Sequence, residues 1–210
     1  MLEIVPLVLG PVQTNTYLVA DSDIKEAVVI DPAWDGGSIY QVAQQRGWRI
    51  AHLWITHAHF DHLGGAAELA EACLSLPLLA LHAEDYPLWR MQGAAALFGL
   101  HIDPGPEPSV YLEHGQILHL GSWTFEVRHV PGHTRGHVLF YCAQAKVAFC
   151  GDVIFQGSIG RTDLPGADYS TLIGSIHSQV LTLPGETRLL SGHGPETTVK
   201  VERDSNPFLK

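Results

Sequence analysis

Positive charge is scarce in this chain. It has 12 Lys and Arg residues against 22 Asp and Glu residues, so its formal net charge is −10. No run of basic residues occurs, whereas proteins that bind nucleic acid normally present a basic face. An acidic surface also disfavours binding to anionic membranes. We therefore expect a small-molecule partner, and neither nucleic acid nor a membrane.

Long apolar segments and cysteines are scarce as well. No apolar stretch reaches 18 residues, so no transmembrane helix is expected. No basic residue precedes Lys25, although a signal peptide begins with a basic region. The three cysteines, Cys73, Cys142 and Cys150, offer neither a disulfide framework nor a CxxC metal site, and we expect buried, reduced thiols. These features predict a cytoplasmic protein that is a monomer or a small homo-oligomer.

The order of apolar segments predicts an α/β fold. Residues 123–130 alternate apolar and polar side chains, which is typical of a half-buried strand. We expect further strands at 2–9, 16–20, 27–30, 52–55, 77–81, 138–142, 147–150 and 188–190. Helices are expected at 36–46, 64–73, 84–100 (with breaks) and 168–183, whereas the tail at 202–210 shows no strong pattern. Two β-rich halves predict a single domain over residues 1–210, with two packed sheets and the helices outside.

Histidine is unusually abundant, with 13 residues against 12 for Lys and Arg together. The densest cluster is Thr-His-Ala-His-Phe-Asp-His at 56–62. Imidazoles and a carboxylate suit divalent metals such as zinc. In an extended segment His57 and His59 project to the same side and can bind one ion. Asp61 and His62 lie beyond the turn and can bind a second ion nearby.

Three further candidates each follow an apolar strand and a glycine: His133, Asp152 and His193. Glycine permits a sharp turn and a close backbone approach, and strand ends are where sites in layered α/β proteins are assembled. Two metals sharing Asp152 would suit this set, because a carboxylate has two oxygens. The seven candidate ligands are His57, His59, Asp61, His62, His133, Asp152 and His193. Surface or supporting roles are expected for His52, His82, His101, His114, His119, His129, His137 and His177.

In their order along the chain, these motifs resemble those of the metallo-β-lactamase superfamily. The resemblance rests on T-H-x-H-x-D-H at 56–62, P-G-H-T at 131–134, G-D at 151–152 and G-H-G at 192–194. It implies a four-layer αβ/βα sandwich with two mixed sheets and the metals at one edge of the sheets. It also implies that one metal is held by His57, His59 and His133. A second metal would be held by Asp61, His62 and His193, and Asp152 would bridge the two.

Within that superfamily the chain resembles the glyoxalase II branch. The resemblance rests on residues 10–15, 160–166 and 192–198, with Glu202-Arg203 and Asn206-Pro207-Phe208 downstream. It implies hydrolysis of S-D-lactoylglutathione and related 2-hydroxyacyl thioesters. Larger glyoxalase II enzymes carry a C-terminal helical domain that binds glutathione. Since this chain ends at residue 210, it resembles the short bacterial glyoxalase II-like hydrolases that lack the domain.

The resemblance implies two divalent cations, with zinc favoured and iron or manganese as alternatives. A metal-bridging hydroxide, oriented by Asp61, would attack the thioester carbonyl. The first metal would stabilise the oxyanion, and the second would receive the leaving thiolate. Arg161 is a candidate contact for a substrate carboxylate, because the guanidinium fork suits that group. Alternatively, Arg161 pairs with Asp163 or another acidic residue.

Three other functions stay open at this point. A persulfide dioxygenase of the same superfamily would use a single iron held by His57, His133 and Asp152. A nucleic-acid-processing hydrolase is disfavoured by the net charge of −10 and by the lack of a large inserted cap domain. A non-catalytic metal-binding protein is disfavoured by the complete set of ligands.

Overall fold

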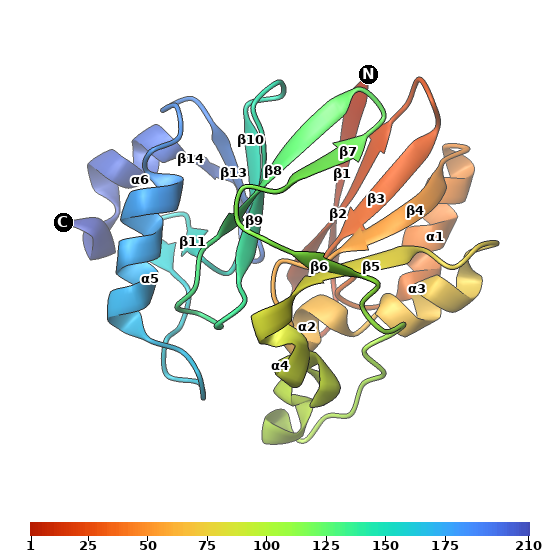
Figure 1. Ribbon diagram of the computed structural model, residues 1–210, viewed down its shortest axis with the longest axis horizontal. Coiled ribbons are helices and arrows are strands. Elements are labelled where there is room, and N and C mark those ends of the chain that lie inside the picture. Colours follow the sequence, from red (N-terminus) through yellow and green to blue (C-terminus); the bar gives the residue numbers. More distant parts are fainter.

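The computed structural model describes residues 1–210 and confirms the predicted α/β sandwich, with two six-stranded sheets packed face to face (Figure 1). In the first sheet, the two pairings among the three N-terminal strands are antiparallel and the remaining three pairings are parallel. Its strands follow chain order: β1 (Leu2–Leu9), β2 (Thr14–Asp21), β3 (Glu26–Ile30), β4 (Arg49–Trp54), β5 (Leu78–His82) and β6 (Val110–Leu112).

The second sheet has the order β14-β13-β10-β9-β8-β7, and only the β10–β13 pair is parallel. A short hairpin, β11–β12, follows β10. The strands are β7 (Ile117–Leu120), β8 (Trp123–His129), β9 (Val138–Cys142), β10 (Val147–Gly151), β11 (Ile154–Phe155), β12 (Ser158–Ile159), β13 (Arg188–Ser191) and β14 (Thr197–Thr198).

Aromatic side chains fill the space between the two sheets. Trp54 of the first sheet packs against Phe125 and Phe140 of the second, with ring centroids 5.1 and 5.4 Å apart. Because successive strand residues point to opposite faces, the predicted alternation in β8 sends Phe125 and Val127 into this core. The contact fixes the two sheets, and therefore their strand ends, relative to each other.

Two further cores lie on the outer faces of the sheets and complete four layers. Leu172, Ile176 and Val180, spaced by four residues, are buried against the second sheet. Before β7 the helical elements are α1 (Gly36–Gln45), α2 (Phe60–Leu63), α3 (Ala66–Ala72), η1 (Ala83–Asp85), α4 (Tyr86–Arg90) and η2 (Gln92–Phe98). After β12 they are α5 (Tyr169–Ser175), the π-helical η3 (Ile176–Val180), α6 (Val199–Ser205) and η4 (Pro207–Leu209).

The structure differs from the sequence prediction in several places. The helix expected at 64–73 begins two residues later, as α3 at Ala66, and the short helix α2 precedes it. Gly64 and Gly65 lie between the two helices, where Trp34 packs so closely that neither position has room for a side chain. Strands β6 and β7 were not expected. Helix α6 and η4 occupy the tail that showed no pattern; Thr198 caps α6 by accepting a hydrogen bond from the Val201 amide at 3.3 Å. No helix in the structure is long and apolar enough to cross a membrane.

Candidate metal centre

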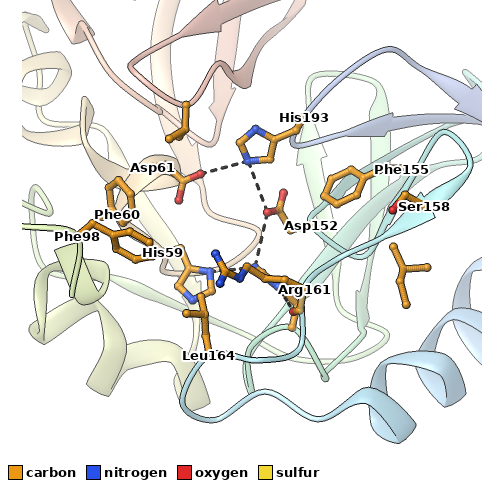
Figure 2. Close-up of a pocket in the computed structure, with 13 residues that line it drawn as sticks. His59, Phe60, Asp61, Phe98, Asp152, Phe155, Ser158, Arg161, Leu164 and His193 are labelled. Carbon is orange, nitrogen blue, oxygen red and sulfur yellow. Dashed lines mark hydrogen bonds and ion pairs between the residues drawn. The ribbon is translucent and has the colours of Figure 1, made fainter. Parts of the chain in front are cut away.

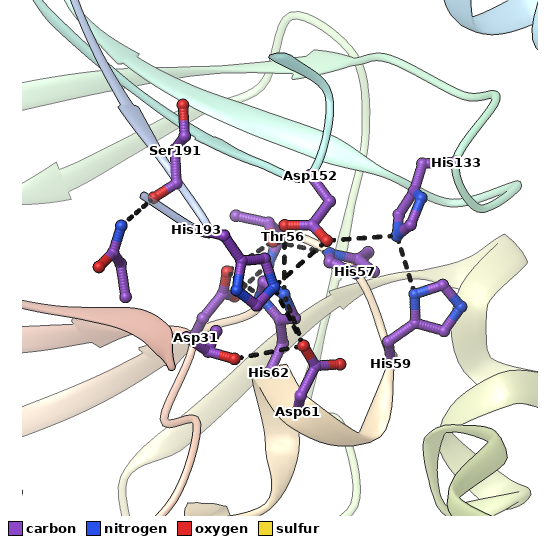
Figure 3. Close-up of polar contacts among 12 residues, drawn as sticks. Asp31, Thr56, His57, His59, Asp61, His62, His133, Asp152, Ser191 and His193 are labelled. Atoms are coloured by element: carbon purple, nitrogen blue, oxygen red, sulfur yellow. Dashed lines mark hydrogen bonds and ion pairs between the residues drawn. The ribbon is translucent and has the colours of Figure 1, made fainter. Parts of the chain in front are cut away.

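Strand ends from both sheets converge at one edge of the sandwich and bring the seven predicted ligands together (Figure 3). His57 follows β4, His133 follows β8, Asp152 follows β10 and His193 follows β13. At this edge the backbone amide of Asn15, in the first sheet, donates a hydrogen bond to the Gly192 carbonyl, next to the second sheet, at 2.7 Å. This bond connects the two sheets. Candidate ligands that are far apart in the sequence, from His57 to His193, therefore lie close together in one centre.

Glycine is required at two of the strand ends. Gly151 has φ +49°, in the left-handed region, and a Cβ there would collide with the Thr56 hydroxyl. A Cβ on Gly192 would collide with the carboxylate of Asp152. These contacts agree with the close backbone approach expected from the sequence.

The candidate ligands form overlapping groups of three. In each group the potential ligand atoms lie within 4.8 Å of one another. We call the first group His57, His59 and His133, and the second group Asp61, His62 and His193. Between them, Asp152 lies within 4.8 Å of His57 and His62, and one of its oxygens is 3.6 Å from Nε2 of both His133 and His193. Asp152 thus has the position of a shared ligand.

Unpaired buried atoms test whether these residues fit metal ions. Nε2 of His57, Nε2 of His62 and Oδ1 of Asp152 are buried and lack a hydrogen-bond partner. An unsatisfied buried polar atom costs about 1–3 kcal/mol, so three of them in one place call for an explanation. Divalent cations would take up these lone pairs. The donor set, five imidazoles and two carboxylates, is one that zinc and iron accept.

Hydrogen bonds on the outer side of two imidazoles orient their other nitrogen toward the centre. Nδ1 of His133 donates to the Arg161 carbonyl at 2.8 Å. Nδ1 of His62 lies 2.9 Å from Oδ2 of Asp31. Nε2 of each ring faces the other candidate ligands, at 2.9 Å from Nδ1 of His59 for His133 and at 3.4 Å from Oδ1 of Asp152 for His62, which is the position for binding a metal ion.

Asp31 is a functional residue that the sequence analysis missed. It is buried at the end of β3 and accepts hydrogen bonds from the amide and hydroxyl of Thr56, at 2.7 and 2.6 Å. The same hydroxyl lies 3.1 Å from Nδ1 of His57. Asp31 therefore supports His62 directly and His57 through Thr56. Its place at a strand end, like that of the ligands, was the available signal.

His137 is fully buried beside the centre, in a supporting position. Its ring stacks on that of His57 with centroids 4.6 Å apart, and its Nε2 accepts from the Asp152 amide at 3.1 Å. Burial lowers its pKa well below the usual value, so the ring is neutral at neutral pH. His137 thus positions a ligand from each side of the centre.

The two groups differ in electrostatics. In the first group, burial and neighbouring imidazoles lower the pKa of His57 strongly and that of His59 to about 3. In the second group, burial opposes the charged form, but Asp152 raises the pKa of His62 and Asp61 raises that of His193. Among the side chains alone, these shifts favour neutral rings at His57 and His59 and protonated rings at His62 and His193.

The centre opens into a pocket of about 380 Å³ (Figure 2). Arg161 lies on its wall, but the guanidinium makes a bidentate contact with Asp163 at 2.7 and 2.8 Å. The pairing that was the alternative interpretation is therefore present in the structure. Apolar side chains make up much of the remaining wall: Val12, Phe60, Phe98, Phe155, Ile159 and Leu164.

Comparisons with known proteins agree with this geometry. Residues 9–193 match the model of the metallo-beta-lactamase superfamily. The hydroxyacylglutathione hydrolase GloC of Haemophilus influenzae is 39% identical over 210 residues, which cover 99% of this chain and 97% of that protein.

Solved structures are similar over nearly the whole chain. BLEG-1, a B3 metallo-beta-lactamase, has a TM-score of 0.92 at 37% identity, covering 99% of this chain and 100% of that chain. TTHA1623 in a di-iron-bound form has a TM-score of 0.88 at 42% identity, covering 98% and 100%. ETHE1 from Myxococcus xanthus has a TM-score of 0.81 at 25% identity, covering 98% and 83%.

The fold, the His/Asp centre and these likenesses lead to one conclusion. The chain belongs to the metallo-beta-lactamase superfamily and is a metal-dependent hydrolase.

Proposed function

We propose that this chain hydrolyses thioesters of 2-hydroxy acids, such as S-D-lactoylglutathione, with two divalent cations. Zinc is the favoured metal, and iron or manganese are the alternatives. The first cation would be held by His57, His59 and His133, and the second by Asp61, His62 and His193. Asp152 would be shared between them. The likeness to GloC supports the substrate class, and the likeness to the di-iron form of TTHA1623 supports a site with two metals.

One observation carries the proposal: two ligand groups that share Asp152 lie side by side on the floor of a single pocket. Two divalent cations there would polarise a substrate carbonyl and lower the pKa of a water molecule. A substrate carbonyl bound over Asp152 would lie near both ligand groups. This arrangement suits the hydrolysis of an activated acyl bond.

The position of Asp61 allows its carboxylate to accept a hydrogen bond from the attacking water molecule. Its Oδ2 accepts from the Thr14 hydroxyl at 3.2 Å and lies 3.2 Å from Nε2 of His193. Burial alone would raise the pKa of Asp61, but His62 and His193 outweigh it and lower the pKa. The carboxylate is therefore ionised at neutral pH and oriented toward the pocket. It can orient a water molecule toward the carbonyl.

No cysteine can act as the nucleophile. Cys150 lies two residues before Asp152, but it is completely buried and burial raises the pKa of its thiol strongly. Cys142 is also buried and its pKa is raised. All three cysteines are free thiols. Because the reactive form of cysteine is the thiolate, water remains the attacking group, and the products are a carboxylate and a thiol.

The apolar wall of the pocket would contact the parts of the substrate that lie away from the reacting carbonyl. The rings of Phe60 and Phe98 pack 5.1 Å apart on one side, and Phe155 lies 6.1 Å from His193 on the other. The lining contains one Lys or Arg side chain, Arg161, and Asp163 already pairs with it. Recognition would therefore depend on the acyl group and the thioester more than on carboxylates of the thiol carrier.

A persulfide dioxygenase is the second candidate, favoured by the likeness to ETHE1. It would use one iron at His57, His133 and Asp152. That assignment gives no metal-binding role to Asp61, His62 and His193, although these residues also converge within 4.8 Å. The binuclear hydrolase accounts for both groups and is therefore preferred.

The test is an assay of the purified protein with S-D-lactoylglutathione, followed by the loss of thioester absorbance under nitrogen. Hydrolysis without oxygen, abolished by a chelator and restored by Zn²⁺, is the expected result. Glutathione persulfide with an oxygen electrode, and a β-lactam, are the comparison substrates. Oxygen consumption without thioester hydrolysis would reject the hydrolase in favour of the dioxygenase. Preferential cleavage of the β-lactam would also reject the proposed substrate class.

A further inference from the structure

Asp85 is a buried carboxylate that lies outside the pocket and carries no role in the hydrolysis described above. It ends η1, directly after β5 of the first sheet, and is 1% exposed. Burying an ionised carboxylate is costly unless it is hydrogen-bonded. Its contacts therefore indicate what it does.

Three hydrogen bonds surround this carboxylate, and all come from segments that bear proposed ligands. Oδ2 accepts from the Ala58 amide at 2.9 Å and from the Thr134 hydroxyl at 2.8 Å. Oδ1 accepts from the Gly136 amide at 2.7 Å. Burial raises the pKa of Asp85, and these three donors oppose the rise.

The partners lie on the two halves of the sandwich. Ala58 stands between His57 and His59, in the segment after β4 of the first sheet. Thr134 and Gly136 follow His133, in the segment after β8 of the second sheet. A single oxygen, Oδ2, thus joins the two segments that supply all three members of the first group.

Close packing reinforces this connection. A Cβ added to Gly136 would lie 2.6 Å from the Asp85 amide nitrogen and 2.9 Å from its Cβ. A side chain at 136 would therefore push the second segment away from Asp85. The segments also meet directly, because the Val138 amide donates to the Thr56 carbonyl at 2.8 Å and Nδ1 of His59 lies 2.9 Å from Nε2 of His133. Asp85 is the one side chain from outside the two segments that accepts hydrogen bonds from both.

We infer that Asp85 is a positioning residue that sets the distance between His57 and His59 on one side and His133 on the other, and so fixes the affinity of the first group for its cation. It acts through the backbone and through Thr134, without touching the cation or the substrate. Asp85 makes no contact with the second group, in which Asp31 supports His62 and the Thr14 hydroxyl supports Asp61. This inference rests on the ligand assignment made under the proposed function.

Zinc affinity measured in two single-group backgrounds tests the inference. His193→Ala removes a ligand of the second group, and His59→Ala removes one of the first. Chelator-treated protein of each background, with and without Asp85→Asn, is titrated with Zn²⁺ against a chromophoric chelator. Asparagine keeps the volume of aspartate but replaces one acceptor oxygen with a donor. We expect Asp85→Asn to weaken zinc binding about tenfold to a hundredfold in the His193→Ala background, and to leave the His59→Ala background unchanged.

Thr134→Val provides a milder variant if Asp85→Asn does not fold. It removes one donor to Asp85 with little change in volume, whereas Thr134→Ser keeps the hydroxyl and should restore the affinity. Ser175→Ala is the matched control, because the Ser175 hydroxyl holds the same second segment through the Pro131 carbonyl at 2.7 Å but contacts no part of the first. Ser175→Ala should keep the zinc affinity of the first group.

Equal zinc affinity with and without the Asp85 and Thr134 substitutions would overturn the inference. So would an equal loss in both backgrounds, because that would indicate general destabilisation. Failure of the ligand assignment would look different. In that case His59→Ala alone would bind as many zinc ions as the unsubstituted protein.

Discussion

The two ligand groups share Asp152 but differ in burial and charge. The first group consists of imidazoles that are at most 7% exposed. In the second group the side chains of Asp61 and His193 are 14% and 28% exposed and face the pocket. Burial keeps His57 and His59 neutral, whereas carboxylates keep protons on His62 and His193.

This difference has a chemical consequence. A cation entering the first group finds His57 and His59 already deprotonated, whereas a cation entering the second group must displace protons from His62 and His193. The first group is thus prepared for metal binding by the fold, and the second is coupled to pH. Asp61 and His193 of the second group are also the more exposed side chains, on the side where a substrate would arrive.

Removal of the shared ligand should have the largest effect. Asp152→Ala removes the carboxylate that connects the groups, so both cations should bind weakly. Metal content should fall well below that of the unsubstituted protein, and thioester hydrolysis should fall on the order of a thousandfold. Elemental analysis and steady-state kinetics measure the two losses. Asp163→Ala, which removes the exposed carboxylate paired with Arg161, should retain both metals. Unchanged metal content in Asp152→Ala would remove Asp152 from the centre.

The pH dependence of metal binding should separate the groups. As the pH falls below the raised pKa values of His62 and His193, protons compete with the cation at the second group, and each displaced proton lowers the affinity up to about tenfold per pH unit. In the first group, His57 and His59 have lowered pKa values and take up no competing proton between pH 8 and 6.5, so its zinc affinity should depend less on pH. Zinc titrations of the His193→Ala and His59→Ala variants at several pH values measure the two slopes. A steeper slope for the first group would contradict the comparison.

Stability without metal should pass through a maximum near the ordinary histidine pKa of 6.5. Below this pH, His57 and His59 become protonated in the unfolded chain but stay neutral in the folded protein. The stability therefore falls as the pH decreases toward about 3. Above it, His62 and His193 keep protons that the unfolded chain has lost, and their stabilisation disappears as the pH rises through their raised pKa values. Each limb has a slope of up to about 1.4 kcal/mol per pH unit per proton. Urea unfolding of chelator-treated protein between pH 5 and 8 should show both limbs, and a steady rise would refute the protonation of the second group.

The smallest effect should come from Arg161. Its pair with Asp163 is exposed to solvent and contributes little, and its carbonyl, which orients His133, belongs to the backbone. Arg161→Gln should therefore change kcat by less than about twofold. The KM for S-D-lactoylglutathione shows whether the guanidinium leaves Asp163 for the substrate. A tenfold rise in KM with unchanged kcat would revive the carboxylate contact predicted from the sequence.

The convergence of the candidate ligands could be predicted from the sequence because four of them lie within six residues and the other three follow glycine at strand ends. The contacts that support them could not be predicted, even where the supporting residue, such as Asp31, lies at a visible strand end. Asp31 reaches His62 across 31 positions, and Asp85 reaches Gly136 across 51. Such contacts arise from tertiary packing and leave no local spacing.

The same reasoning explains the fold elements. Strand β8 is long and alternates, so its pattern was visible in the sequence. Strand β6 has three residues and β7 has four, with several side chains exposed, and such short segments carry no clear period. Helix α6, with seven residues, is likewise too short. The formation of α6 depends on the Thr198 cap and on the buried Glu202. The Glu202 carboxylate accepts hydrogen bonds from the Thr197 hydroxyl at 2.6 Å and from the Gly157 amide at 2.9 Å.

The central claim is that two groups sharing one aspartate hold two cations. The most direct test is the number of metal equivalents per chain in protein purified without added metal. We expect about two equivalents of zinc, or of a mixture with iron or manganese. One equivalent of iron, with no second cation taken up on titration, would contradict the account and assign the centre to oxygen-dependent chemistry.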